Sequence, residues 1–271
     1  MPTDETPPLS MWPDAPVAEL EVPVAWDVTL HDGWLVFDWG PQSEPFEFRE
    51  LPRELALRGL LDLDVDIDEA VRDFLLSYGV IDDVYDSRKL APIQLPVARV
   101  AMLPRVDQSP DSSKNHVLNA RAFLHAARAL TRHWIAHSEG RAVADAWVQE
   151  GFEFDPLPLD GLAWYYFTSC INYGLKPYTV RFEFAGTKPR PNLYEALCLQ
   201  IANVVIEGLP PRVCANQNCA HYFIRQQGRA EHGQNRTDGV KFCSASCSRA
   251  QWQRDYRASK RRRRNEAGLG G

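Results

Sequence analysis

Apolar and polar residues alternate over two short stretches near the start of the chain, a pattern typical of half-buried β-strands. Residues 27–30 and 34–37 carry this alternation, and they flank His31-Asp32-Gly33. An Asp-Gly pair between alternating segments is a strong signal for a tight turn. We therefore expect a β-hairpin here, and Phe46-Glu47-Phe48 is a candidate for a third strand.

Most of the other apolar residues repeat at helical spacing. The pattern is clearest in residues 117–136, where Leu118, Ala122 and Ala126 fall on one face. The expected helices cover residues 51–61, 69–78, 117–136, 142–150, 161–173 and 193–207, with a strand over 178–184. Two prolines end the last of these helices, because proline cannot continue a helix. We expect an α+β fold that is mainly α.

Composition divides the chain into four parts. Residues 1–25 contain six prolines and several acids, which predicts a flexible or extended arm. Residues 26–210 are expected to form a mainly helical domain of unknown ligand, with the small β-hairpin or meander in front. Residues 211–264 carry four cysteines and a basic helix, and residues 265–271 are expected to be a disordered tail.

Two cysteine pairs dominate the last part of the chain. Cys214 and Cys219 enclose four residues, Cys243 and Cys247 enclose three, and 23 residues separate the pairs. This is close to the pattern of structural zinc sites, in which four thiolates saturate a tetrahedral ion. The i,i+4 spacing of the second pair places both sulfurs on one face of a helical turn, for which Ser244 and Ser246 are suitable caps. A saturated ion has no position for a substrate water, so we expect one structural zinc ion.

The helix expected to begin near Ser246 has an aromatic side and a basic side. Trp252 and Tyr256 are four residues apart on the first side. We expect them to pack on the cysteine-bearing segment and to leave an arginine stripe facing outward, where its guanidinium groups can bind phosphate. The alternative is a solvated basic tail. The candidate nucleic-acid contacts are Arg249, Arg254, Arg257, Lys260, Arg261 and Arg264.

Several local motifs in residues 212–264 occur together. They are Cys-Ala-Asn-x-x-Cys at 214–219, Tyr222-Phe223, Phe242-Cys243-Ser244 and the basic segment at 254–257. This region, about a fifth of the chain, resembles the treble-clef zinc finger of the CGNR family of bacterial proteins. The resemblance implies a DNA-binding finger that follows a helical region, in a stress-linked transcription regulator. One departure is that Ser-Arg-Ala follows the last cysteine, where the family has Gly-Asn-Arg.

The net charge of −6 hides a strong asymmetry along the chain. Residues 1–90 contain 21 acidic and 6 basic side chains, and residues 91–211 contain 11 of each. Residues 212–271 contain 4 acidic and 13 basic side chains, so the front carries −15 and the end +9. The overall charge would argue against a nucleic-acid partner, whereas the basic end favours one.

Two other patterns have a metal interpretation that the spacing does not support. His133 and His137 lie four apart on a helix, but Trp134 stands where a metalloprotease has glutamate, and no third ligand is apparent. Aspartates alternate with apolar residues from Asp62 to Asp68, but a calcium loop needs glycine where Ile67 stands. We interpret these acids as a lead-in to a helix N-terminus, which favours negative charge.

The remaining candidates have structural interpretations. The long helix has one basic face, which we expect to be solvated rather than to contact phosphates; it carries Arg121, His125, Arg128 and Arg132. Cys170 and Cys198 lie on apolar helices and are expected to be core thiols. The aromatic run 164–167 cannot face one way on a helix, so we expect core packing rather than a small-molecule pocket.

These patterns predict a cytoplasmic, non-enzymatic zinc protein that binds nucleic acid, with DNA as the expected form. No run of about 18 apolar residues is present, and the first basic side chain is Arg49, so neither a membrane span nor a secretory signal is expected. The N-terminal domain would bind a small molecule or a protein. The alternative is a protein–protein interaction module in which the zinc finger is purely structural.

Overall fold

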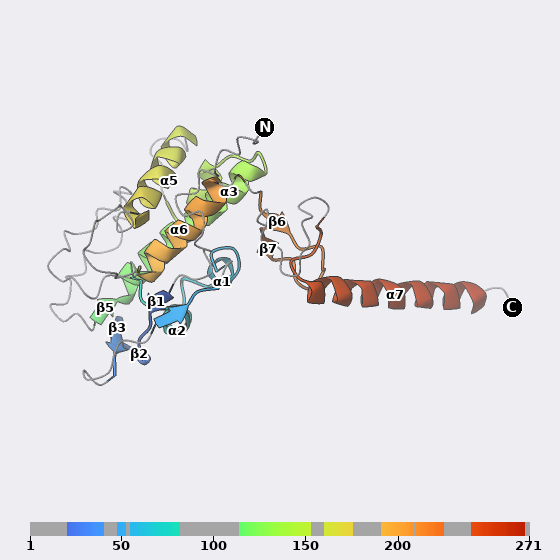
Figure 1. Ribbon diagram of the computed structural model, residues 1–271, viewed down its shortest axis with the longest axis horizontal. Coiled ribbons are helices and arrows are strands. Elements are labelled where there is room, and N and C mark those ends of the chain that lie inside the picture. Colours follow the sequence, from blue (N-terminus) through green and yellow to red (C-terminus); the bar gives the residue numbers. More distant parts are fainter. Residues whose placement is uncertain are drawn as a thin grey trace, which may run out of the picture. The chain divides into compact units, whose positions relative to one another are not determined.

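The structure, a computed structural model, divides the chain into two compact units, Met1–Gly208 (unit 1) and Leu209–Gly271 (unit 2). It describes residues 21–40, 48–52, 55–81, 114–152, 160–175, 191–206, 208, 210–224 and 240–268. Unit 1 is mainly helical with small sheets, and unit 2 contains a two-stranded hairpin and a long helix (Figure 1). The expected fold class, α+β and mainly α, is therefore confirmed.

The predicted hairpin forms the centre of a three-stranded sheet. Strands β2 (Asp27–His31) and β3 (Trp34–Asp38) are antiparallel, and the turn between them has positive φ at both Asp32 (50°) and Gly33 (78°). Positive φ at both central residues defines a type I′ turn, which matches the twist of the two strands. The third strand is β5 (Lys114–His116), which pairs with β3. Of residues 46–48, which were expected to add this strand, the structure describes only Phe48, and it lies in a different sheet.

A second sheet joins two segments that lie outside that hairpin. Strand β1 (Glu21–Pro23) pairs antiparallel with β4 (Phe48–Glu50). Val22, Val24 and Ala25 are all buried. Residues 21–25, which their proline content assigned to the flexible arm, thus contribute to the core of unit 1.

Six helices make up the rest of the described part of unit 1. They are α1 (Gly59–Asp62), α2 (Asp68–Tyr78), α3 (Val117–Ser138), α4 (Ala144–Val148), α5 (Asp160–Leu175) and α6 (Leu193–Ile206). The helix expected over residues 51–61 is much shorter, because residues 55–58 form turns. The strand expected over 178–184 lies outside the described residues.

Helix α6 is the most buried of the helices that the structure describes in unit 1. Every residue from Leu193 to Ala202 is buried, which is typical of a helix surrounded by protein on all sides. It packs against α3 and α5, and Figure 1 shows its ribbon beside that of α3. A capping box begins it: Asn192 Oδ1 accepts from the Glu195 amide at 3.0 Å, and Glu195 Oε2 accepts from the Asn192 amide at 2.9 Å.

His133 lies among aromatic rings from α4 and α5. Its side chain is fully buried, and Nδ1 accepts a hydrogen bond from the Trp147 indole at 3.0 Å. The imidazole stacks on Phe167 and meets Trp164 edge-on, with centroid distances of 4.5 Å in both cases. Burial, assisted by the charge of His137, lowers the pKa of His133 from 6.5 to about 4. His133 is thus a neutral core residue, and part of the aromatic run packs against it.

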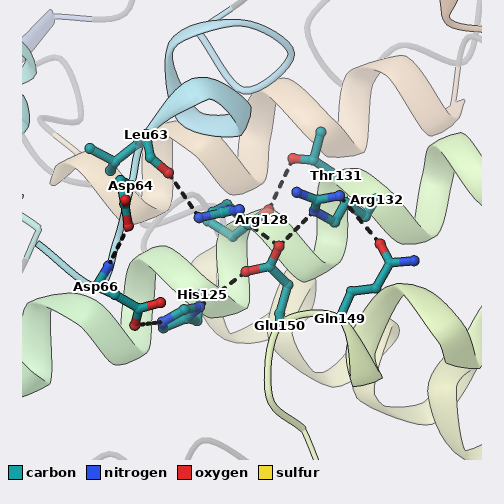
Figure 2. A network of polar contacts seen from close by, with 10 residues as sticks. Leu63, Asp64, Asp66, His125, Arg128, Thr131, Arg132, Gln149 and Glu150 are labelled. Atoms are coloured by element: carbon teal, nitrogen blue, oxygen red, sulfur yellow. Dashed lines mark hydrogen bonds and ion pairs between the residues drawn. The ribbon is translucent and has the colours of Figure 1, made fainter.

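A polar network links α3 to the segment after α4 (Figure 2). The Glu150 side chain is 2% exposed, and its Oε1 lies 3.2 Å from Arg128 Nε and 2.6 Å from Arg132 Nε. His125 Nδ1 lies 3.0 Å from the other carboxylate oxygen. Arg128 also donates to the Leu63 carbonyl oxygen at 2.9 Å, which attaches the α1–α2 connection to α3. A single buried carboxylate is therefore shared by two arginines.

The basic face of α3 is thus not a solvated face. Arg121 forms an ion pair with Asp68 at 2.6 Å, and Arg128 and Arg132 pair with Glu150. These side chains are half-buried and hold neighbouring segments of unit 1 together. Both sequence-based interpretations, solvation and phosphate contact, are replaced by internal ion pairing. Asp68 is the first residue of α2, as expected if the acidic segment 62–68 ends at a helix N-terminus.

Because of His133, unit 1 should lose stability in acid. The pKa is lower in the folded chain than in the unfolded chain, so the unfolded state binds more protons and gains population as the pH falls from 6.5 towards about 4. The full shift corresponds to about 3 kcal/mol of unfolding free energy. Urea unfolding followed by near-ultraviolet circular dichroism across this pH range measures the loss.

A variant pair separates His133 from other acid-sensitive groups. His133→Asn removes the titration while its amide oxygen can still accept from Trp147, so the decline in stability should be much shallower. His31→Asn alters a histidine whose side chain is 79% exposed, and it should keep the wild-type profile. Identical profiles for His133→Asn and wild type would contradict this role.

Glu150→Gln should destabilise unit 1 by about 3–5 kcal/mol, because it leaves two half-buried arginines without their carboxylate. The matched control is Glu139→Gln, whose partner Arg141 has a side chain that is 51% exposed. Removing an exposed pair should cost about 0–1 kcal/mol. Urea unfolding at neutral pH compares the two variants, and equal effects would show that the Glu150 network adds no more than a surface pair.

Candidate metal centre

The first cysteine pair lies on a short β-hairpin. Strands β6 (Arg212–Val213) and β7 (Tyr222–Phe223) are antiparallel, and Phe223 is buried. Cys214 directly follows β6, and its amide donates to the His221 carbonyl oxygen at 2.9 Å, which extends the ladder by one hydrogen bond. The turn that follows carries Cys219 back towards Cys214.

Asn216 organises the turn between these two cysteines. Its carbonyl oxygen accepts from the amides of Cys219 (2.8 Å) and Ala220 (3.1 Å), and its Oδ1 accepts from the Asn218 amide at 3.1 Å. Ala220 has a φ of 48°, a left-handed conformation that turns the chain into β7. Asn216 belongs to the Cys-Ala-Asn-x-x-Cys motif, and asparagine side chains commonly stabilise such turns, but its contact with the long helix of unit 2 is not indicated by the sequence.

The second cysteine pair lies at the start of helix α7 (Ala245–Gly268). Ser244 Oγ accepts from the Cys247 amide at 3.2 Å, as expected for a serine at the N-cap. Cys243 lies just before the helix, and its amide lies 3.5 Å from Cys214 Sγ. The cap places Cys243 and Cys247 on the same side of the first turn, with their sulfurs 3.5 Å apart.

All four sulfur atoms converge on one point. The Sγ atoms of Cys214, Cys219, Cys243 and Cys247 lie within 4.8 Å of one another, and the Cys219–Cys243 distance is 3.7 Å. A tetrahedron with metal–sulfur bonds of about 2.3 Å has edges of about 3.8 Å. A disulfide would need about 2.05 Å. The group can therefore hold one metal ion, and all six cysteines of the chain are free thiols.

The surroundings of the cluster act differently on two of its thiols. Hydrogen bonds from Ser244 and then Asn216 lower the pKa of the Cys247 thiol to about 6. Desolvation raises the pKa of Cys219. Metal binding requires thiolates, so Cys247 is the ligand that the local structure prepares most strongly.

Polar side chains of α7 contact the hairpin. Gln251 is buried, and its Oε1 accepts from the Gln217 amide at 3.2 Å. Arg254 donates to Asn216 Oδ1 and, at 2.9 Å, to Gln251 Oε1. We expected the rings of Trp252 and Tyr256 to pack on the cysteine-bearing segment. This expectation is wrong, because both rings are exposed.

The predicted phosphate-contacting residues therefore divide into three groups. Arg254 is half-buried and holds α7 against the turn, so it is not part of a free basic surface. Arg264 belongs to α7, but its side chain lies outside the described residues. The exposed members of the set are Arg249, Arg257, Lys260 and Arg261.

The other cysteines lie in the core of unit 1. Cys170 and Cys198 are fully buried, as expected, and Cys198 Sγ lies 3.9 Å from the Cys170 carbonyl oxygen. Burial raises the pKa of Cys170 to about 12 and also raises that of Cys198. Among the described residues, the four-cysteine cluster is the only group of at least three potential metal ligands. Neither the histidines of α3 nor the aspartates 62–68 join such a group.

Unit 2 is thus a hairpin-and-helix module that can hold one metal ion between four thiols. No family model, curated protein or solved structure matches the chain. Within the part of the chain that the structure describes, no helix combines the length and apolar composition that crossing a membrane requires.

Protein purified without chelators should carry close to one equivalent of metal per chain. Cys243→Ser should lower this content strongly, because the Cys243 sulfur is close to those of both Cys219 and Cys247. Cys170→Ala alters a core cysteine of unit 1 and should keep the full content. Metal analysis by mass spectrometry checks all three proteins. An unchanged metal content in Cys243→Ser would place the ion elsewhere.

Proposed function

We propose that unit 2 holds one structural zinc ion and that helix α7 binds nucleic acid. The single observation that supports the second part most strongly is the exposed positive charge of α7. Arg257, Lys260 and Arg261 are all exposed, and none has a carboxylate partner among the described residues. A surface of unpaired cations on a helix attracts a polyanion, and arginine matches phosphate geometry with two parallel hydrogen bonds.

Zinc is the metal that best fits the cluster. Four sulfur ligands in a tetrahedral arrangement indicate zinc or an iron centre, and zinc is the usual ion of small hairpin-and-helix modules. Four thiolates complete the coordination sphere, so no position is left for a substrate water. We therefore propose a structural ion and no enzymatic activity at this site. Structural zinc contributes about 10–16 kcal/mol of binding free energy in such modules.

The hairpin followed by a capped helix supports the resemblance to the treble-clef finger of the CGNR family, without extending it beyond unit 2. The wider proposal, a cytoplasmic transcription regulator whose unit 1 binds a small molecule or a protein, rests on that resemblance. The rival proposal is a protein–protein interaction module in which the finger has only a structural role. These two proposals differ in whether the cations of α7 contact phosphate.

Charge reversal on α7 tests the contact with phosphate. Arg257→Glu/Arg261→Glu should weaken binding of a labelled DNA duplex. The slope of log affinity against log salt should fall by about 0.9 for each phosphate that α7 no longer neutralises. Fluorescence anisotropy over a salt series measures both quantities. The control, Arg72→Glu/Arg141→Glu, makes the same change in net charge on unit 1 and should keep the wild-type slope.

The two possible results of this experiment separate the proposals. A smaller slope in the α7 variant alone supports contact between α7 and phosphate. Unchanged binding in that variant, with its metal content intact, would contradict nucleic-acid binding through α7 and leave the interaction module as the better proposal.

A further inference from the structure

Two aromatic side chains on α7 are turned to solvent. Trp252 is 67% exposed and Tyr256 is 58% exposed, the two highest values among the large exposed hydrophobic residues of the described chain. Their rings stack on each other, with centroids 5.7 Å apart and planes 15° from parallel. Each ring therefore has one face against its neighbour and another face turned away from it. Keeping two such rings in water is unfavourable unless a partner covers them.

The pair lies on the side of α7 that faces away from the metal cluster. At 3.6 residues per turn, Cys247, Gln251 and Arg254 fall on one side of the helix, and they contact the hairpin. Trp252 and Tyr256 fall roughly opposite to them. The four-cysteine cluster and the polar contacts thus fix the helix so that both rings point to solvent.

Basic residues continue this aromatic face in both directions along the helix. Arg249, Trp252, Tyr256, Lys260 and Arg263 follow one another at spacings of three or four residues, and all are exposed. We call these five residues the aromatic–basic strip. Asp255, the one acidic residue of α7 with a described side chain, accepts a hydrogen bond from Gln251 at 2.9 Å instead of pairing with the strip. The strip therefore combines flat π surfaces with cations that have no carboxylate partner among the described side chains.

Single-stranded nucleic acid carries the two features that such a surface recognises. Unpaired bases stack on exposed aromatic rings, and the phosphates between them bind arginine and lysine. In a duplex the base faces already stack on one another, so a duplex offers mainly its phosphates. We propose that the aromatic–basic strip is a stacking site for unpaired bases, through which the chain prefers single-stranded nucleic acid to duplex. This proposal rests on the proposed binding of nucleic acid by α7.

Two other occupants fit the strip less well. A second copy of α7 would bring arginine and lysine side chains of the same charge together, which is destabilising. A membrane surface is bound by helices with a broad apolar face. The strip has only Trp252 and Tyr256 as large apolar side chains, and its other three members are cations.

Removal of both rings tests the proposal on the full-length, metal-loaded protein. Trp252→Leu/Tyr256→Leu keeps apolar side chains of helical preference and removes the π faces. The probes are a labelled oligothymidylate, an oligouridylate and a DNA duplex of equal length. Wild type should bind at least one single strand more tightly than the duplex. The variant should lose about tenfold for each ring on that strand, with duplex affinity and salt slope nearly unchanged.

A matched control uses another exposed aromatic residue. Tyr165 on α5 is 57% exposed and lies in unit 1, so Tyr165→Leu should keep wild-type affinity for every probe. Metal content and circular dichroism confirm that each variant is folded, which is expected because the substituted side chains are exposed. Preference for the oligouridylate or for the oligothymidylate distinguishes RNA from DNA, and either preference supports the proposal.

The failures of the two proposals are distinguishable. If wild type binds neither single strands nor duplex, nucleic-acid binding by α7 fails, and the stacking proposal fails with it. If wild type binds duplex and single strands equally, and Trp252→Leu/Tyr256→Leu binds as wild type does, only the stacking proposal is overturned. Two further measurements test the other occupants: binding to phosphatidylserine vesicles, and self-association by analytical ultracentrifugation. The stacking proposal would also be overturned if Trp252→Leu/Tyr256→Leu lost either of these and kept its single-strand binding.

Discussion

The convergence of four sulfur atoms is the constraint on which unit 2 depends. Pro211, Cys214 and Phe223 are the only buried apolar residues among those the structure describes there. Burying a phenylalanine stabilises by about 3 kcal/mol at most, whereas fixing the backbone of each residue costs about 1–2 kcal/mol. Apolar burial therefore cannot hold the hairpin against α7. An ion bound by all four thiolates can, because its binding free energy is available only when both cysteine pairs meet.

The orientation of α7 follows from the polar groups of the turn. Asn216 and Gln251 are buried, and a buried polar group that lacks a hydrogen bond is costly. Gln251 and Arg254 satisfy the Gln217 amide and Asn216 Oδ1, so these two polar side chains, rather than the aromatic ones, face the hairpin. Hydrogen-bond satisfaction thus outweighs aromatic burial at this contact.

Features set by neighbouring residues could be predicted from the sequence, and features set by distant partners could not. The cysteine spacing and the Asp-Gly turn are local, and the structure places both as the spacing indicates. Strand β5 pairs with β3, and Glu150 pairs with two arginines of α3. Both contacts join segments that are distant in the sequence, so the spacing of apolar residues within each segment does not predict them. The contact face of α7 was mispredicted for the same reason: aromatic spacing shows that a helix has two faces, but the partner decides which face is covered.

Helices α3 and α7 show why a row of arginines alone does not identify a binding surface. Arg128 and Arg132 of α3 share Glu150, whose side chain is 2% exposed, so their charge is partly offset inside the protein. In unit 2 the one acidic side chain that the structure describes is Asp255, and it accepts from Gln251. Within the described part of unit 2, no acidic side chain therefore pairs with the exposed cations of α7. A polyanion that bound α7 would gain free energy from released counterions, whereas the internally paired arginines of α3 would have fewer to release.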